Sequence, residues 1–285
     1  MGAPDFLVIG HLAKDRTAEG WRLGGTAAYA SLTASKLGLR AAVLTSAASD
    51  LDPSLLLPDI DVRLLPASET TTFENIYSPE GRLQYVWARA GRIAASDVPR
   101  EFREAKVVLL GPLVGEVEEE VAHCFSRSLL AISTQGWLRA VLPDGRVEQI
   151  SPRQWRPRLL LKRSRALFVS EEDLPPTEVE EALARWAAQV PILAFTRGAG
   201  GARLWSERRW RQVPAIPAQE LDPTGAGDVF AGAFLSRYVE TGDAWQAALF
   251  AAAAASISLE APGTAAIPSR GQVEERLRAH EARAT

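Results

Sequence analysis

The residues with the clearest capacity for chemistry form one stretch, which runs from Leu221 to Phe230. Within it, Gly225, Ala226 and Gly227 precede an apolar segment that has the pattern of a helix. The free backbone N–H groups at a helix N-terminus bind anions, and side chains no larger than a methyl group let an anion approach. These three residues therefore predict a site for a phosphate or an oxyanion.

Two carboxylates flank this predicted anion site. Asp228 lies in the first turn of the predicted helix, where its charge would repel a bound phosphate. A carboxylate in that place is suited to take a proton from a hydroxyl that attacks phosphorus. Asp222, six residues earlier, could face a magnesium ion or order the loop. The alternative is a glycine-rich helix start that an aspartate caps, but the length of the string favours phosphoryl transfer.

Short apolar runs alternate with helical patterns along most of the chain, and they would position this site. Phe6 to Ile9 and Ala41 to Thr45 are predicted strands on either side of a helix that follows Gly24 and Gly25. The later predicted strands are Val107 to Leu110, Leu129 to Ser133, Ala166 to Val169 and Ile192 to Phe195. Such alternation is typical of a mainly parallel sheet with crossover helices.

The segment between residues 61 and 90 has a different pattern. Its β-rich runs, Val62 to Leu65, Thr70 to Tyr77 and Leu83 to Trp87, are too close together for crossover helices. We therefore expect them to pair antiparallel in a small sheet that projects from the main domain. Further along, Glu116 to Phe125 is predicted to be a helix with acidic residues in its first turns, where the helix dipole favours them.

The composition of the 285-residue chain excludes several functional classes. Its 32 basic and 35 acidic side chains give a net charge of −3, so no overall basic field would attract nucleic acid or anionic lipid. A basic cluster between Arg153 and Arg165 is interpreted as a solvated face. The single cysteine, Cys124, cannot form an internal disulfide. No signal peptide is evident, and the uncharged run from Ala244 to Leu259 is shorter than the ~20 residues of a transmembrane helix. We expect a cytoplasmic protein.

The string from Asp222 to Asp228 resembles the signature of the PfkB, or ribokinase-like, family of carbohydrate and nucleoside kinases. The resemblance implies an α/β fold: a three-layer α/β/α sandwich with a mainly parallel central sheet and a small β-sheet lid. It implies one kinase domain over residues 1–285, with the lid formed by about 11–24 and 61–90. It also implies ATP and Mg²⁺ as cofactors, with a monovalent cation left open. The implied catalytic residues are Asp228, Gly225, Ala226 and Gly227.

Other segments resemble the family in the same order along the chain. Asp15, Gly24 and Gly25 correspond to residues that bind the acceptor, since a carboxylate can accept two sugar hydroxyls and glycine lets a sugar approach the backbone. Asp15 could otherwise be a surface residue. Thr26 and Tyr29 occupy the region where the family often has Asn, which is a departure at the sugar site.

The resemblance also implies a nucleotide site and a metal residue. Thr196, Gly198 and Gly201 resemble the family's Thr-x-Gly-x-x-Gly segment along the ATP phosphates. Ser170 and Asp173 replace the Asn and Glu of its Asn-x-x-Glu motif, and the shorter carboxylate of Asp173 could still hold water on Mg²⁺. The full set implied to bind the cofactor is Thr196, Gly198, Gly201, Asp222, Ser170 and Gly263. A dinucleotide fingerprint is absent from this segment, which would need glycine at Arg203.

Shorter matches resemble a narrower group, the plant-type myo-inositol kinases and their bacterial relatives. They lie in Gly10 to Asp15, Leu23 to Ala27 and Glu69 to Glu74, and Gln135 and Arg139 resemble a Gln-x-x-x-Arg pattern after a strand. Gln135 could reach a hydroxyl and Arg139 could steady the product phosphate. Equally, the two could be a loop cap and a surface arginine.

The sequence thus leads to an ATP-dependent kinase for a hydroxyl of a small sugar or cyclitol, with myo-inositol as the first choice. The alternatives are a kinase for ribose, fructose, 2-keto-3-deoxygluconate or a nucleoside, and a non-catalytic sugar or nucleotide sensor, which the altered motif from Ser170 to Asp173 supports. Neither nucleic acid nor membrane is an expected partner, and we expect a monomer or a homodimer. Glu74 and Asn75 alternate along a lid strand, so only one of them would cover the substrate.

Overall fold

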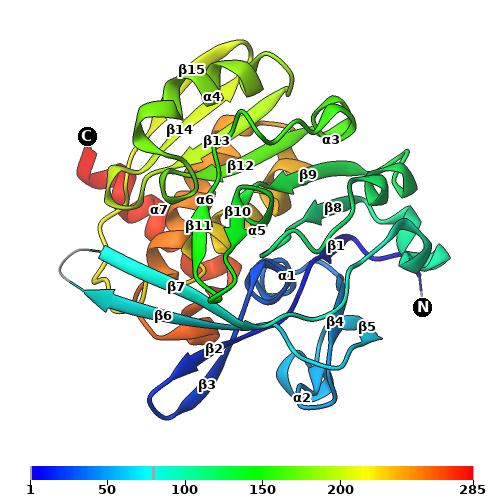
Figure 1. Cartoon of the computed structure of the whole chain (residues 1–285). Coiled ribbons are helices and arrows are strands. Elements are labelled where there is room, and N and C mark those ends of the chain that lie inside the picture. The colour runs from blue at the N-terminus through cyan, green and yellow to red at the C-terminus, as the bar shows by residue number, and fades with distance from the viewer. Residues whose placement is uncertain (1, 79–80, 285) are drawn as a thin grey trace.

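The structure is a computed structural model that describes residues 2–78 and 81–284, and its centre is a large twisted sheet (Figure 1). Within these residues the sheet has nine strands, in the order β15-β14-β13-β12-β9-β8-β1-β4-β5. The parallel strands are β1 (Phe6–Ile9), β4 (Ala41–Ala47), β5 (Asp61–Pro66), β8 (Val107–Leu110), β9 (Leu129–Ser133), β12 (Ala166–Ser170) and β13 (Ile192–Thr196). Two antiparallel strands, β14 (Ala202–Ser206) and β15 (Arg209–Val213), complete one edge.

Helices cover both faces of this sheet, because alternate residues of each buried strand pack in opposite directions. Phe6 and Val8 of β1 belong to one apolar core, whereas Leu7 and Ile9 belong to the other. The first core is closed by α1 (Thr26–Lys36), α2 (Pro53–Leu56), α5 (Ala226–Thr241), α6 (Ala244–Ser258) and α7 (Arg270–Ala284). The second is closed by α3 (Arg158–Arg163), α4 (Val179–Ala187) and a 3₁₀ helix at Glu119–Cys124. The predicted three-layer sandwich is confirmed.

The alanine-rich run is the buried helix α6, which packs in the first core. Among the helices of the described residues, none combines the length and the apolar character needed to cross a bilayer.

A second, smaller sheet lies over the carboxyl ends of the parallel strands and forms the lid (Figure 1). Its order is β3-β2-β6-β7, and its strands are β2 (Ala13–Thr17), β3 (Gly20–Gly24), β6 (Thr72–Ser78) and β7 (Gly81–Ala88). The hairpin of β10 (Arg139–Val141) and β11 (Val147–Gln149) adds to it, because the N–H of Val86 in β7 donates to the carbonyl of Gly145 at 2.8 Å.

Two local predictions were wrong. The run Asp61–Pro66 does not belong to the lid but pairs parallel with β4 in the main sheet. The short helix α2 lies in the crossover from β4 to β5, which the spacing within residues 61–90 does not address, and Val62 and Leu64 pack against the first core. The segment from Glu116 to Phe125 is helical only as the 3₁₀ turn Glu119–Cys124. Glu116 itself is buried, because its carboxylate accepts backbone N–H groups.

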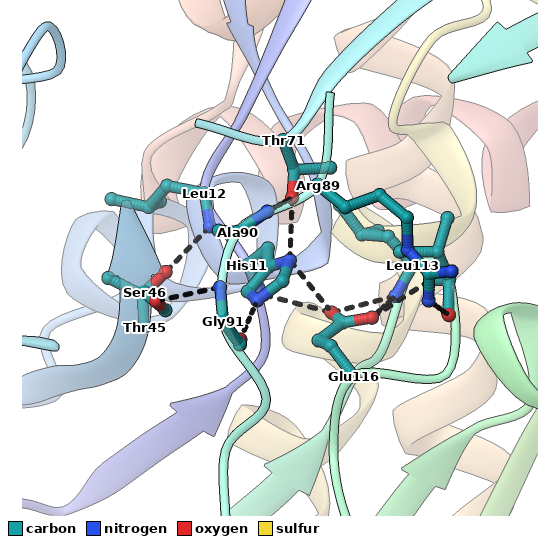
Figure 2. A network of polar contacts seen from close by, with 11 residues as sticks. His11, Leu12, Thr45, Ser46, Thr71, Arg89, Ala90, Gly91, Leu113 and Glu116 are labelled. Carbon is teal, nitrogen blue, oxygen red and sulfur yellow. Dashed lines mark hydrogen bonds and ion pairs between the residues drawn. The ribbon is translucent and has the colours of Figure 1, made fainter. Parts of the chain in front are cut away.

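The buried His11 joins the main sheet to both chain segments that enter and leave the lid (Figure 2). Its Nε2 lies 2.7 Å from the carbonyl oxygen of Gly91, which follows β7, and its Nδ1 lies 2.7 Å from Oγ1 of Thr71, which precedes β6. A carbonyl only accepts, so Nε2 carries the proton and Nδ1 accepts from the Thr71 hydroxyl. That hydroxyl in turn accepts from the N–H of Ala90 at 3.0 Å.

Glu116 lies on the other side of His11, and these two residues form the hinge between the main sheet and the lid (Figure 2). Its carboxylate accepts the backbone N–H groups of His11 at 3.1 Å, Leu113 at 2.9 Å and Val114 at 2.8 Å. Three donated hydrogen bonds compensate a buried carboxylate for its lost hydration. The chain segments that precede β6 and follow β7 are therefore both fixed to the main sheet at His11.

Candidate active site

The candidate site lies where the parallel strands of the large sheet end. Their register places the carboxyl ends of β12 and β13 side by side, with Ser170 opposite Thr196. The ends of β1 and β8 are equally close, since a β-carbon on Gly10 would lie 2.9 Å from the carbonyl carbon of Gly111. This edge of an open α/β sheet is the usual place for a ligand. The lid faces the same edge.

The predicted anion site is present as a loop followed by the N-terminus of α5. Gly225 has a left-handed φ of 77°, and the helix begins at Ala226. Asp222 orders the loop, because its carboxylate accepts the N–H of Thr224 and the N–H of Gly263, both at 2.9 Å. The alternative role that the sequence left open for Asp222, ordering the loop, is thus observed.

The first turn of α5 contains both paired and unpaired backbone amides within the described part of the chain. The N–H of Val229 returns to the carbonyl of Gly225 at 2.9 Å, and that of Ala226 reaches Pro223 at 3.3 Å. For the amides of Gly227 and Asp228, the described part of the chain supplies no acceptor. A β-carbon on Gly227 would meet no atom within 4 Å. The arrangement can bind an anion at these two amides.

Asp228 is the point at which distant parts of the chain meet. Its Oδ1 accepts a hydrogen bond of 2.7 Å from the hydroxyl of Thr26. Burial raises the pKa of the Asp228 carboxyl to about 6, and the nearby charges of Asp173 and Asp15 raise it further. The Thr26 hydrogen bond and the positive charge of Arg139 lower this pKa. Asp15, Arg139 and Asp173 were predicted from separate motifs, and the fold brings them into electrostatic reach of Asp228.

Asp15 lies on β2, on the face of the lid that is turned to the site. A β-carbon on Gly24 would lie 2.7 Å from Cγ of Asp15, so this glycine makes room for the carboxylate. Gly25 has a φ of 91°, and a β-carbon there would lie 2.7 Å from the carbonyl oxygen of His11. The sequence predicted close approach of a sugar at both glycines. The structure shows that each glycine first accommodates a group of the protein itself.

The altered motif at the end of β12 forms a capping box on a 3₁₀ turn, Glu171–Asp173. The N–H of Ser170 donates to Oδ2 of Asp173 at 3.1 Å, and the N–H of Glu172 donates to Oγ of Ser170 at 3.2 Å. Asp173 is only 4% exposed. One of its oxygens is thus engaged in local structure, while its charge still acts on Asp228.

The predicted nucleotide loop follows β13, beside this capping box. Thr196 ends the strand, and Gly198 begins a 3₁₀ turn with a φ of 46°. Gly201 has a φ of 73°, and a β-carbon there would lie 2.7 Å from the amide nitrogen of Ala215. Gly201 is therefore required by the close packing of the turn against the segment after β15, whereas Thr196 and Gly198 lie at the carboxyl edge.

Gln135 and Arg139 lie after β9 on a 3₁₀ turn, Gln135–Trp137, and at the start of β10. Gly136 between them packs against the backbone, since a β-carbon there would lie 2.7 Å from the amide nitrogen of Leu113. Arg139 joins the group around Asp228 through its charge. The carbonyl of Gln135 accepts the N–H of Leu138 at 3.2 Å, which is a local contact of the turn.

The lid carries further polar residues on the same face as Asp15. Register places Arg22 opposite Asp15, and Nη1 of Arg22 lies 4.0 Å from Oδ2 of Asp222. Asn75 shares that face, and Nε2 of Gln84 donates to Oδ1 of Asn75 at 2.9 Å. Glu74 lies on the opposite face, where it accepts from Nε1 of a tryptophan. Residues that lie opposite each other in paired strands share a face of the sheet. Arg22 and Gln84 could therefore have been predicted as site residues only if the strand register had been known.

The carboxylates of the site suit a divalent cation that is bound together with phosphates. Within residues 2–78 and 81–284, no group of three or more His, Cys, Asp or Glu side chains is placed to hold a metal by itself. Mg²⁺ is usually bound through one or two carboxylates, water and the phosphates of its substrate. The buried Asp173, whose charge acts on Asp228, fits that requirement.

Comparison with known proteins gives consistent results for sequence and fold. Residues 162–270 match the pfkB family carbohydrate kinase. The cytidine kinase of Thermococcus kodakarensis is 27% identical over 256 residues, which cover 82% of this chain and 88% of that protein. The inositol 3-kinase of Oryza sativa subsp. japonica is 31% identical over 277 residues, which cover 88% of this chain and 68% of that protein.

Among solved structures, a pyrophosphate-dependent kinase in the ribokinase family, complexed with a pyrophosphate analog and myo-inositol, has a TM-score of 0.77. Its sequence is 23% identical, and the match covers 95% of this chain and 99% of that chain. The likeness confirms the predicted fold class.

Proposed function

The chain belongs to the pfkB family of carbohydrate kinases and is a phosphotransferase with an alcohol group as acceptor, and we propose that it transfers the γ-phosphate of ATP to a hydroxyl of a small cyclitol, with myo-inositol as the first candidate. The observation that carries this proposal is the position of Asp228. Its carboxylate lies beside the open amides of α5, and the charges of Asp15, Asp173 and Arg139 act on it.

In the proposed reaction, Asp228 takes the proton of the acceptor hydroxyl. A carboxyl with a pKa of about 6 is mostly ionised at neutral pH and still basic enough to assist the transfer. The hydroxyl oxygen forms a bond to the γ-phosphorus, and the bond from that phosphorus to the β-phosphate oxygen breaks, which releases ADP. The amides of Gly227 and Asp228 at the start of α5 stabilise the charge that develops on the phosphoryl oxygens.

Asp173 is the residue that we propose to hold Mg²⁺ through a coordinated water. When bound, Mg²⁺ neutralises charge on the phosphates of the donor. The buried position of Asp173 supports this assignment, because the capping box fixes its carboxylate in one orientation. Arg139 would steady the phosphate of the product, since a guanidinium can form paired hydrogen bonds to phosphate.

The inner face of the lid supports a small, hydroxyl-rich acceptor. Over its described part this face presents Asp15 and the hydrogen-bonded amides of Asn75 and Gln84. Carboxylate and amide groups suit hydroxyls, which both donate and accept hydrogen bonds. Two aromatic residues of the lid, Trp21 and Trp87, lie on the outer face, where basic side chains cover their rings.

A nucleoside is the second candidate acceptor, because the Thermococcus cytidine kinase matches most of this chain. A base of that size would need an apolar or aromatic surface on which to stack. The sensor alternative has less support, since the carboxylates of the site and the open amides of α5 lie together.

The test is product formation with two donors and a panel of acceptors. Purified protein with Mg²⁺ is given ATP or pyrophosphate, together with myo-inositol, ribose, fructose, 2-keto-3-deoxygluconate or cytidine, and the phosphorylated product is identified by mass spectrometry. Asp228→Asn is the matched control for contaminating kinases. Phosphorylation of myo-inositol from ATP supports the proposal. Turnover with another acceptor contradicts the choice of myo-inositol, and turnover with pyrophosphate but not ATP contradicts the choice of donor. ATP binding without turnover of any acceptor favours the sensor.

A further inference from the structure

We propose that Thr26 is a positioning residue for the catalytic base: its hydroxyl fixes the carboxylate of Asp228 so that one chosen oxygen faces the acceptor. This inference rests on the proposed function, because it takes Asp228 as the base. Thr26 stands in the region where the sequence departs from its family, and no motif assigned it a role.

The geometry identifies which oxygen is available. Oγ1 of Thr26 lies 2.7 Å from Oδ1 of Asp228, although the two residues are 202 positions apart in the sequence. A carboxylate only accepts, so the hydroxyl donates. Oδ1 is thus engaged, and Oδ2 is the oxygen that can take the proton of the acceptor. A base that is held by a neighbouring donor loses less entropy when it reaches its reactive orientation.

The packing around Thr26 explains why its hydroxyl points to Asp228. Thr26 is 0% exposed and is the first residue of α1. Its side chain lies against the backbone at the end of β8, since a β-carbon on Gly111 would be 2.8 Å from Cβ of Thr26. A β-branched side chain has few rotamers, and the contact with Gly111 restricts them further. The absence of a side chain at residue 111 therefore gives Thr26 its place.

Three charged groups and one hydroxyl act on Asp228, and they come from four parts of the fold. Asp173 and Asp15 disfavour its ionised form, Arg139 favours it, and the Thr26 hydroxyl favours it directly. Loss of the hydroxyl should therefore raise the pKa of the carboxyl. A purely structural defect in α1 would not produce that change in a specific direction.

The experiment compares Thr26→Val, Thr26→Ser and Thr33→Val by steady-state kinetics. Thr33 is the matched control, because it is also a fully buried threonine of α1, but its hydroxyl donates within the helix to the carbonyl of Tyr29 at 2.7 Å. Thr26→Val should lower kcat by about 10- to 100-fold, the value of a hydrogen bond to a charged group, with KM for the donor unchanged. Thr26→Ser should restore kcat to within about threefold of the wild type.

A second measurement keeps the inference separate from the proposed reaction. Carboxyl ¹³C NMR gives the pKa of Asp228 in metal-free protein, with the signal assigned from Asp228→Asn. The pKa should rise in Thr26→Val and return in Thr26→Ser. Thr26→Ala replaces Thr26→Val if the valine variant does not fold. An unchanged pKa together with an unchanged kcat overturns the positioning role. A wild type that turns over no acceptor contradicts the proposed function, and the NMR titration still decides whether Thr26 controls Asp228.

Discussion

The aromatic ring of Tyr29 lies directly against the α-carbon of Gly225, where a β-carbon would be 2.5 Å from Cγ of the ring. Tyr29 is 2% exposed, and Gly225 has a φ of 77° that side chains disfavour. Glycine is therefore required at residue 225 for both space and backbone conformation. The turn that opens the anion site is built on α1, the helix that also supplies Thr26.

We expect the two glycines of this turn to respond oppositely to the same substitution. Gly225→Ala should lower the free energy of unfolding by about 1–3 kcal/mol, since it combines overlap with Tyr29 and an unfavourable φ. Gly227→Ala should leave the protein at least as stable, because alanine favours a helix by about 1 kcal/mol, and it should leave KM for the donor close to that of the wild type, because a methyl group still lets an anion approach the amides. Urea unfolding and kinetics on both variants measure this. Equal stability of the two variants would contradict the role given to Tyr29.

The activity of the wild type should fall at acidic pH. Burial raises the pKa of the Asp228 carboxyl to about 6, so the ionised base is lost as the pH falls through that value. A plot of kcat against pH should therefore show an acid limb near this pKa. Asp228→Asn should lower kcat by about 10²–10⁴-fold, the usual contribution of a general base. If kcat stays constant from about pH 5 to pH 8, the carboxyl of Asp228 is not the general base.

The same carboxyl should make the protein less stable as the pH rises. Its pKa is higher in the folded state than the ordinary value of 3.8, so the unfolded chain binds fewer protons between these two values. The free energy of unfolding contributed by this group therefore falls as the pH rises from 3.8 to about 6, and it stays low above that. Asp228→Asn should unfold at a higher temperature than the wild type at about pH 8, with a smaller difference at about pH 4. Calorimetry at both values tests the sign.

His11→Ala should loosen the lid. The substitution leaves the carbonyl of Gly91 and the hydroxyl of Thr71 without their buried partner, at about 1–3 kcal/mol for each unsatisfied group. Hydrogen exchange should accelerate in β6 and β7, and KM for the acceptor should rise more than kcat falls. His123→Ala is the matched control, because His123 is exposed. Unchanged exchange in both lid strands would show that the hinge does not depend on His11.

Arg22→Ala should weaken donor binding in a way that Arg16→Ala does not. Both side chains are 50% exposed and belong to the same strand pair, but Arg22 reaches toward Asp222 whereas Arg16 lies near Glu74 on the outer face. An exposed ion pair contributes less than ~1 kcal/mol, so we expect KM for the donor to rise by at most about fivefold. Steady-state kinetics with both variants would measure it. The same KM change in both would refute a specific role of Arg22.

The parts of the site that a continuous motif encodes were predictable from sequence. The loop from Asp222 to Asp228 contains both its special backbone conformation and its carboxylates within a few residues, so local chemistry is sufficient to interpret it. The alternation of apolar runs with helices likewise predicts the parallel sheet, because each buried strand must pack on both faces.

The parts that depend on contact between distant segments were not predictable. The hydrogen bond from Thr26 to Asp228 joins α1 to α5, and no local pattern around either residue indicates it. The strand Asp61–Pro66 was misplaced because its partner is chosen by burial against the first core. Glu116 was predicted as an acid in the first turn of a helix, and its actual role was missed because its backbone donors come from loops that only the fold brings together.

The position of Arg22 beside Asp15 has an energetic consequence for the whole catalytic cycle. One strand pair of the lid carries both residues: Asp15 is the proposed contact of the acceptor, while Arg22 reaches the loop that Asp222 and Gly263 form in the donor half. If one ligand displaces the strand pair β2–β3, it also changes the binding free energy of the second ligand. Thermodynamic linkage is reciprocal, so the factor by which the acceptor alters donor affinity is the factor by which the donor alters acceptor affinity.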